Sequence, residues 1–156
     1  MKRAALLLAV LPGLPASADE VLTLQRAVTA ATAAMELCQA QQAHAGVVVA
    51  DASGKPKAVL IADGANALAF ESARRKAFTA AATGIPSEKL GALERDKPQV
   101  GRDVLALHPD LTGLGGGLPI IKEGMVIGAI GVGGAKGPDI DLSCARAGLD
   151  AIGAVP

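Results

Sequence analysis

Apolar residues recur between residues 22 and 43 at the spacing of one face of a helix. The stripe consists of Leu24, Val28, Ala31, Met35 and Cys38. Its steps of four, three, four and three positions are typical of an amphipathic α-helix. Thr23 is placed to cap the start of this helix with its hydroxyl group. Gly46 is expected to close it, and a β-strand is predicted to follow.

Two segments have the pattern of β-hairpins. Residues 46–63 hold the short apolar strand Val47–Ala50 and the second strand Lys57–Ala62, joined by residues rich in Asp, Ser, Gly and Pro that favour a turn. Residues 118–122 and 125–132 are apolar except for Lys122, and they flank Glu123-Gly124. This dipeptide only approximates the usual two-residue hairpin turn.

Helices are predicted before, between and after these hairpins. A second helix is expected over 67–83 and ends at Gly84 and Pro86. Shorter helical pieces are expected over 87–95 and 99–107, and a short strand over 111–114. A last helix carries Leu142, Ala145, Leu149 and Ile152, with Asp139 or Asp141 as its cap.

This order of elements predicts the α+β class. Hairpins place strands antiparallel to their neighbours, so helices should pack on an antiparallel sheet rather than alternate with parallel strands. No Gly-x-Gly-x-x-Gly follows the first strand, and a dinucleotide-binding fold therefore has no support.

The first eighteen residues have the pattern of a secretory signal peptide. Lys2 and Arg3 precede the apolar run Ala4–Leu11, and Ala16-Ser17-Ala18 forms a small-x-small cleavage site. The run is far shorter than the roughly twenty residues that span a bilayer. We therefore expect residues 1–18 to be removed, and the mature protein to be soluble, periplasmic or secreted, without a membrane anchor.

The remaining residues 19–156 have the length of one domain. Without Lys2 and Arg3, the 15 basic residues become 13 against 15 acidic ones, a net charge of −2. A nucleic-acid partner would favour a basic surface and aromatic stacking residues. Phe70 and Phe78 are the only aromatic residues, so no nucleic-acid partner is expected.

Glycine is concentrated around the second hairpin. It occupies positions 113, 115, 116 and 117, and again 128, 131, 133 and 134. One explanation is a recess in which backbone N–H groups face an anionic ligand. The other is a tight turn with a helix packed closely against the strands. The glycines alone do not decide between the two.

Several short motifs resemble those of the GlcG/HbpS-like family of haem-binding proteins. They are Asp63-Gly64-Ala65, Ser72-Ala73-x-x-Lys76-Ala77-x-Thr79-Ala80-Ala81, Gly115-Gly116-Gly117-x-Pro119-Ile120, Val126-Ile127-Gly128-Ala129-Ile130-Gly131-Val132 and Asp141-x-x-Cys144-Ala145-x-Ala147-Gly148. The resemblance runs from about residue 22 to 152. It departs at Gly133-Gly134, where the family often has Ser-Gly.

The resemblance implies a profilin-like fold. Such a fold has a five-stranded antiparallel sheet with the first and last helices side by side on one face. The resemblance also implies a homo-oligomer and haem as the cofactor, with links to cobalamin-related operons and to redox sensing. Candidate ligand-binding residues are Lys76, Gly115, Gly116, Gly117 and Gly131.

Iron ligands are scarce in this chain. His44 and His108 are the only histidines, and His108 lies nearer in sequence to the glycine cluster. Each is also explained as a loop residue with ordinary hydrogen bonds. Met35 and Met125 are alternative soft ligands, although Met35 lies on the apolar stripe and suits the core. No Cys-x-x-Cys-His is present, which excludes covalent attachment of a c-type haem.

Lys76 is the last residue of the basic run 74–76. Successive helical residues point about 100° apart, so one of the three should face the sheet or a neighbour. The family motif selects Lys76, whose ammonium group could meet a carboxylate of a substrate or of a partner subunit. The alternative is a solvated helix face.

Cys38 and Cys144 are the only cysteines. The resemblance places the first and last helices together, so the pair is a disulfide candidate in an oxidising compartment. Two buried thiols are the alternative. Together these features favour an exported protein that binds or senses haem or a small molecule. An enzyme acting on a small hydroxy acid and a structural oligomeric module are the alternatives.

Overall fold

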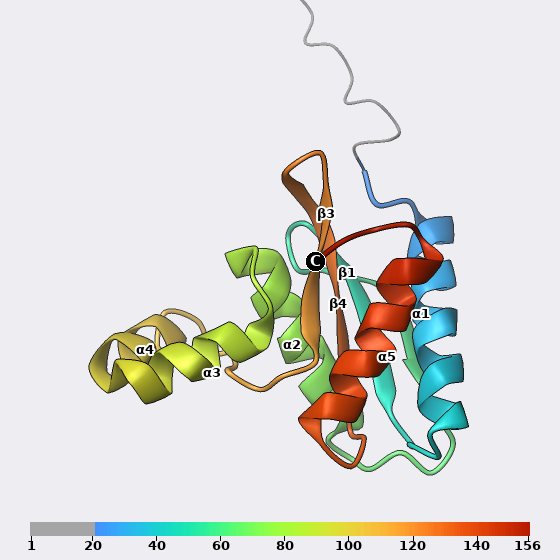
Figure 1. The fold of residues 1–156 in the computed structure, drawn as a ribbon, viewed down its shortest axis with the longest axis horizontal. Helices are drawn as coiled ribbons and strands as arrows, with labels where there is room; N and C mark the ends of the chain where they lie inside the picture. The colour runs from blue at the N-terminus through green and yellow to red at the C-terminus, as the bar shows by residue number, and fades with distance from the viewer. Residues whose placement is uncertain (1–20) are drawn as a thin grey trace, which may run out of the picture.

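The structure is a computed structural model that describes residues 21–156, so the leader predicted over 1–18 lies outside the described residues. Four strands form one sheet, with helices on both of its faces (Figure 1). In chain order the elements are α1 (Leu24–Ala40), β1 (Gly46–Asp51), β2 (Pro56–Ile61), α2 (Ala69–Thr83), α3 (Ser87–Asp96), α4 (Pro98–Leu105), β3 (Gly117–Lys122), β4 (Met125–Gly133) and α5 (Pro138–Ala151).

The sheet is antiparallel throughout and has the strand order β2-β1-β4-β3. Both predicted hairpins are confirmed, and the α+β class with them. The predicted fifth strand is wrong for the described residues. At 111–114, the Thr112 N–H donates to Thr79 Oγ1 at 2.9 Å, and the Leu114 carbonyl accepts from Ser87 Oγ at 2.6 Å. Because side chains satisfy these backbone groups, the segment needs no neighbouring strand.

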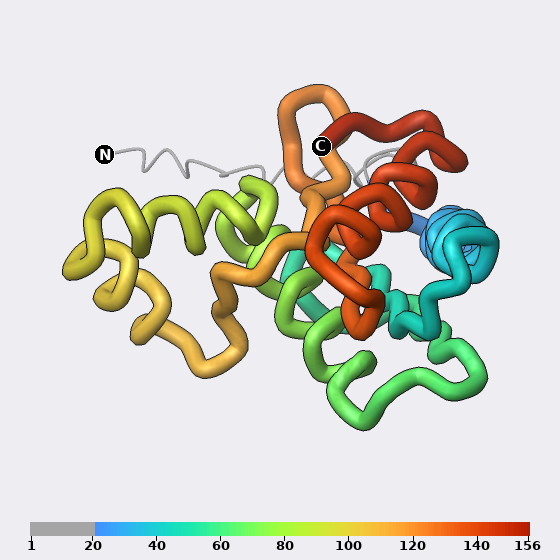
Figure 2. Tube along the Cα trace, turned by 60° about the horizontal axis from the view of Figure 1, so that its bottom comes forward, coloured from blue at the N-terminus to red at the C-terminus, as the bar shows by residue number. Residues whose placement is uncertain are grey.

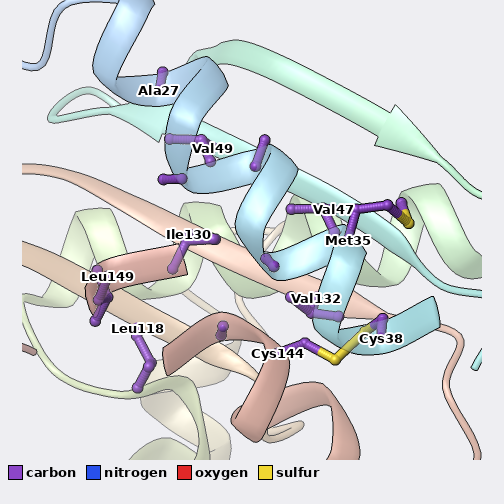
Figure 3. Close-up of a cluster of buried hydrophobic side chains, with 14 of the residues drawn as sticks. Ala27, Met35, Cys38, Val47, Val49, Leu118, Ile130, Val132, Cys144 and Leu149 are labelled. Atoms are coloured by element: carbon purple, nitrogen blue, oxygen red, sulfur yellow. A yellow bond between two sulfur atoms is a disulfide. The ribbon is translucent and has the colours of Figure 1, made fainter. Parts of the chain in front are cut away.

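Helices α1 and α5 lie side by side on one face of the sheet, as the resemblance implied (Figure 1). Alternate strand residues point toward them, among them Val47, Val49, Ile130 and Val132 (Figure 3). The helices meet them with small side chains, chiefly alanine. The buried side chains of this layer form the largest apolar core of the described residues.

Helix α2 covers the opposite face of the sheet through very small residues. Ala73 and Ala77 of α2 pack against Val48 of β1. Gly131 of β4 lies beneath the same helix, and a Cβ atom there would strike the backbone of Ala73 and Ala77. The helix therefore lies close to the backbone of the strand, with almost no side-chain layer between them.

The ends of the helices were predicted with mixed success. The Thr23 hydroxyl accepts a hydrogen bond from the Arg26 N–H at 3.3 Å, which confirms the cap of α1. Gly84 ends α2 with φ at +71°, a conformation that suits glycine. The predicted cap of α5 by Asp139 or Asp141 is wrong. Gly137 occupies that position without a side-chain cap, because both carboxylates lie within the first turn.

Helices α3 and α4 form a small hairpin that projects from one side of the molecule (Figure 2). They pack mainly on each other, and Gly101 of α4 lies directly against Glu94 of α3. The hairpin is joined to the body where Gly91 lies against Gly113. Between residues 21 and 156, no helix is both long and apolar enough to cross a membrane.

Candidate ligand-binding site

A cavity of about 750 Å³ lies where α3 faces the start of α5. Its floor comes from α2, and its rim comes from the loops before β3 and after β4. We call it the α3–α5 pocket. The pocket is lined by Ser72, Lys76, Glu88, Lys89, Ala92, Arg95, Gly113, Leu114, Gly115, Gly134, Ala135, Gly137, Pro138, Asp139, Asp141 and Leu142.

A buried ion pair lies in the wall of this pocket. Lys76 is only 3 % exposed and Asp141 only 4 %. The Lys76 ammonium donates to Asp141 Oδ2 at 2.6 Å and to the Val132 carbonyl at 2.9 Å. Lys76 thus points toward the sheet, as predicted for one member of the basic run. Its carboxylate partner in the structure, Asp141, belongs to the same chain, and contact with a carboxylate of a substrate or of a partner subunit stays a prediction.

Asp141 connects three parts of the site. Its Oδ1 accepts a hydrogen bond from the Ala135 N–H at 3.2 Å, which holds the loop after β4 against α5. Burial raises the pKa of this carboxyl group above its usual value, while the hydrogen bond from Lys76 opposes the increase. Both charges are satisfied within the protein, so the pair fixes α2, the loop and α5 relative to one another.

Helix α3 forms the opposite wall. Ser87 anchors it, because its hydroxyl donates to the Leu114 carbonyl and accepts from the Gly117 N–H at 3.0 Å. Lys89 and Arg95 line the pocket from α3, and both are exposed. Neither side chain makes a hydrogen bond or an ion pair with another residue between 21 and 156. These two cations are available to a ligand.

Some glycines of the cluster border the pocket, and others allow α2 to pack closely against the strands. Gly115 lines the pocket. Gly116 has φ at +112°, which suits glycine, and it packs against Asp141 and Lys76. A side chain at this position would crowd the ion pair. Gly117 and Gly131 lie against the backbone of α2 and do not line the pocket, and their role as ligand-binding residues stays a prediction. At these two positions a Cβ atom would collide with the helix.

Neither histidine lines the α3–α5 pocket. His44 Nδ1 donates to the Asp63 carbonyl at 2.7 Å, beside a smaller cavity of about 240 Å³. His108 stacks on Phe78 with ring centroids 4.6 Å apart, and its Nδ1 accepts from the Asp110 N–H. Both rings thus have the ordinary loop interactions of the alternative explanation. Within residues 21–156, no cluster of three or more His, Cys, Asp or Glu side chains could hold a metal ion.

The two cysteines are bonded in the structure. Cys38 of α1 and Cys144 of α5 form a buried disulfide with a Cα–Cα distance of 5.5 Å (Figure 3). Beside it, Gln41 Nε2 donates to Ser143 Oγ at 3.1 Å. The disulfide lies three residues beyond Asp141, and it therefore ties the helix that begins at the pocket to α1.

Sequence reasoning missed the wall that α3 provides. Lys89 and Arg95 belong to a helix with charged residues of both signs, which reads as a solvated surface. Asp141 was noticed only as a helix cap and as part of a family motif. Lys76 and Asp141 are both charged residues of the family motifs, and this shared feature could have suggested that they form a pair.

Comparisons with known proteins identify relatives of this chain and of its fold. The family profile described as "haem degrading protein HbpS-like" matches residues 22–150. The crystal structure of HbpS is 36% identical in sequence with a TM-score of 0.78, and the match covers 92% of this chain and 97% of that one. A double mutant of HbpS from Streptomyces reticuli is also 36% identical, covering 94% and 96% of the two chains with a TM-score of 0.77.

A more distant structure shares the fold. It is the crystal structure of a PduOC–haem complex, 24% identical, with a TM-score of 0.79 and coverage of 86% of this chain and 97% of that one. No curated protein sequence matches this chain. The match of the family profile over nearly all the described residues identifies the chain as a member of the HbpS-like family.

Proposed function

We propose that this protein binds a haem-type tetrapyrrole in the α3–α5 pocket. The family to which it belongs is described as haem-degrading, and a neighbour of the same fold was crystallised with haem. The observation that carries the proposal is the pocket itself. Its volume of about 750 Å³ lies within the range of about 300–1,000 Å³ typical of small-molecule sites.

The residues of the pocket fit the organic part of such a ligand. Gly113, Leu114, Gly115 and Pro138 give a rim of small and apolar groups along which a flat ring can lie. The cations of α3 can meet the ring's carboxylates. The ring would thus be bound by contact with the rim and by charge at its acidic edge.

The residues of the pocket do not fit the iron. None of its lining residues carries an imidazole, thioether, thiolate or phenol group, the usual protein ligands of haem iron. His44 and His108 lie outside the pocket. We therefore assign no chemistry to an iron centre in this site.

Hemin titration of residues 19–156 tests the proposed function. We expect a shifted, saturable Soret band. Ala92→Trp places a large ring in the pocket and should weaken binding, whereas Val100→Trp on exposed α4 is the matched control and should not. A featureless, non-saturating response, or equal binding by the Ala92→Trp variant, would contradict the proposal.

We propose further that the protein acts outside the cytoplasm. The pattern of residues 1–18 and the bond between Cys38 and Cys144 support this, because disulfides persist in oxidising compartments. Expression of the full chain in a bacterium should release a protein that begins at Asp19. Leu7→Arg interrupts the apolar run and should retain the uncleaved chain in the cytoplasm. Cytoplasmic accumulation of both chains would refute export.

A further inference from the structure

We infer that the α3–α5 pocket recognises its ligand through carboxylates held by Lys89 and Arg95, so that metal-free tetrapyrroles bind there as well as haem does. This inference rests on the proposed function and names the chemistry by which that site selects its ligand. It follows from two features of the pocket. The cations on α3 are unpartnered, and the lining offers no ordinary iron ligand.

The cations of α2 near the pocket are already engaged. Lys76 is paired with Asp141. Arg74 bonds Glu71 and Asp110, and Arg75 donates to two backbone carbonyls. Of the cations that line the pocket, only those on α3 keep their hydrogen-bond donors free. A guanidinium and an ammonium group suit two carboxylates, the first by bidentate bonds and the second as a point charge.

The acidic residues of the lining give the ligand one orientation. Asp139 lies in the first turn of α5, and Glu88 lies in the first turn of α3, where its Oε2 is close to Gly115. Arg95 lies in the last turn of α3, about 10 Å farther along the helix axis at 1.5 Å per residue. An anionic edge would be attracted to Lys89 and Arg95, which lie about 9 Å apart along the helix axis, and repelled by the carboxylates of Glu88 and Asp139. Haem and protoporphyrin carry both propionates on one edge, so both match this arrangement.

The wall that holds the two cations is fixed in place. Ser87 bonds the backbone at Leu114 and Gly117, on either side of Gly115-Gly116. Farther along α3, Gly91 packs so closely on Gly113 that a Cβ atom would meet its carbonyl group. These contacts set the distance between α3 and the rim, and therefore the position from which Lys89 and Arg95 reach a ligand.

Three ligands distinguish recognition of the carboxylates from recognition of the metal. Residues 19–156 are titrated with hemin, metal-free protoporphyrin IX and the dimethyl ester of hemin. We expect protoporphyrin IX to bind within about threefold of hemin, and the ester at least about tenfold more weakly, because its neutral ester groups cannot form ion pairs with Lys89 and Arg95. Hemin binding without protoporphyrin binding, or equal binding of the ester, would overturn this inference and leave haem binding intact. Binding of none of the three ligands would overturn the proposed function instead.

Matched variants of the α3–α4 hairpin locate the effect. The Lys89→Ala/Arg95→Ala variant should weaken hemin and protoporphyrin IX alike by about tenfold or more, since two charged hydrogen bonds are lost. The Lys97→Ala/Arg102→Ala variant removes the same charges outside the pocket and should change either affinity less than twofold. Equal effects of the two variants would overturn the assignment. So would a loss of hemin binding confined to His44→Ala or His108→Ala.

Discussion

Removal of one partner of the Lys76–Asp141 pair should strongly destabilise the protein. Lys76→Met leaves the Asp141 carboxylate buried, with the Ala135 N–H as its remaining hydrogen-bond donor. It also removes the donor to the Val132 carbonyl. Breaking a buried pair in this way costs about 3–5 kcal/mol of unfolding free energy. This is a large fraction of the roughly 5–15 kcal/mol typical of a whole domain.

The corresponding change in melting temperature is large enough to measure easily. At the usual unfolding entropy per residue, a cost of this size should lower the melting temperature of the domain by about 10–17 °C. Circular dichroism of residues 19–156 at pH 7 gives this value, and urea unfolding gives the free energy. Lys136→Met removes an exposed lysine from the neighbouring loop and is the control. It should change stability by no more than about 0.5 kcal/mol.

The double variant Lys76→Met/Asp141→Leu separates the cause from a mere loss of contacts. If the isolated charge is the source of the cost, the double variant should recover to within about 2 kcal/mol of the natural protein. A double variant as unstable as the sum of its single changes would refute this reasoning. A cost below about 1 kcal/mol for Lys76→Met would refute it as well.

Three further predictions concern other parts of the fold. Reduction should add two mass units to the intact protein, and an unchanged mass would contradict the bond. The Cys38→Ala/Cys144→Ala variant should lower the free energy of unfolding by about 4–5 kcal/mol, because the bridge joins residues 106 positions apart. Gly131→Ala should cost about 1–3 kcal/mol or more in urea unfolding, because the new methyl group meets the backbone of α2; a more stable variant would contradict the close packing. The Arg74 hydrogen bonds hold the pKa of Asp110 below its ordinary 3.8. Their contribution to the free energy of unfolding is therefore complete above pH 3.8 and is lost as the pH falls through the lowered pKa. Arg74→Met should abolish this acid-dependent loss, about 1 kcal/mol at most at such a partly exposed site. A pH profile identical to that of the natural protein would contradict this prediction.

The sequence was most informative where local patterns determine local structure. The apolar period located α1, and the turn residues located both hairpins. Gly84 marked the end of α2, because the chain there needs a positive φ. The family resemblance then supplied what no local pattern carries, namely that the first and last helices lie together.

Long-range contacts explain the failures. Asp141 has the residue type and position of a helix cap, but its carboxylate forms an ion pair with Lys76, 65 positions away. Residues 111–114 look like a strand, but Thr79 and Ser87 satisfy their backbone groups. Gly131 suggested open space for a ligand, whereas the space is filled by α2. In each case the deciding partner is distant in sequence and invisible to periodicity.

The closeness of α2 to β4 also has a consequence for how the chain can change. Where helix and strand are separated by glycine and alanine alone, no flexible side chain is available to absorb an added methyl group. Enlargement at Gly131 must therefore shift the whole helix, and Lys76 moves with it. The geometry of the Lys76–Asp141 bond would then depend on the spacing between α2 and β4, and substitutions that change this spacing would also alter the wall of the pocket.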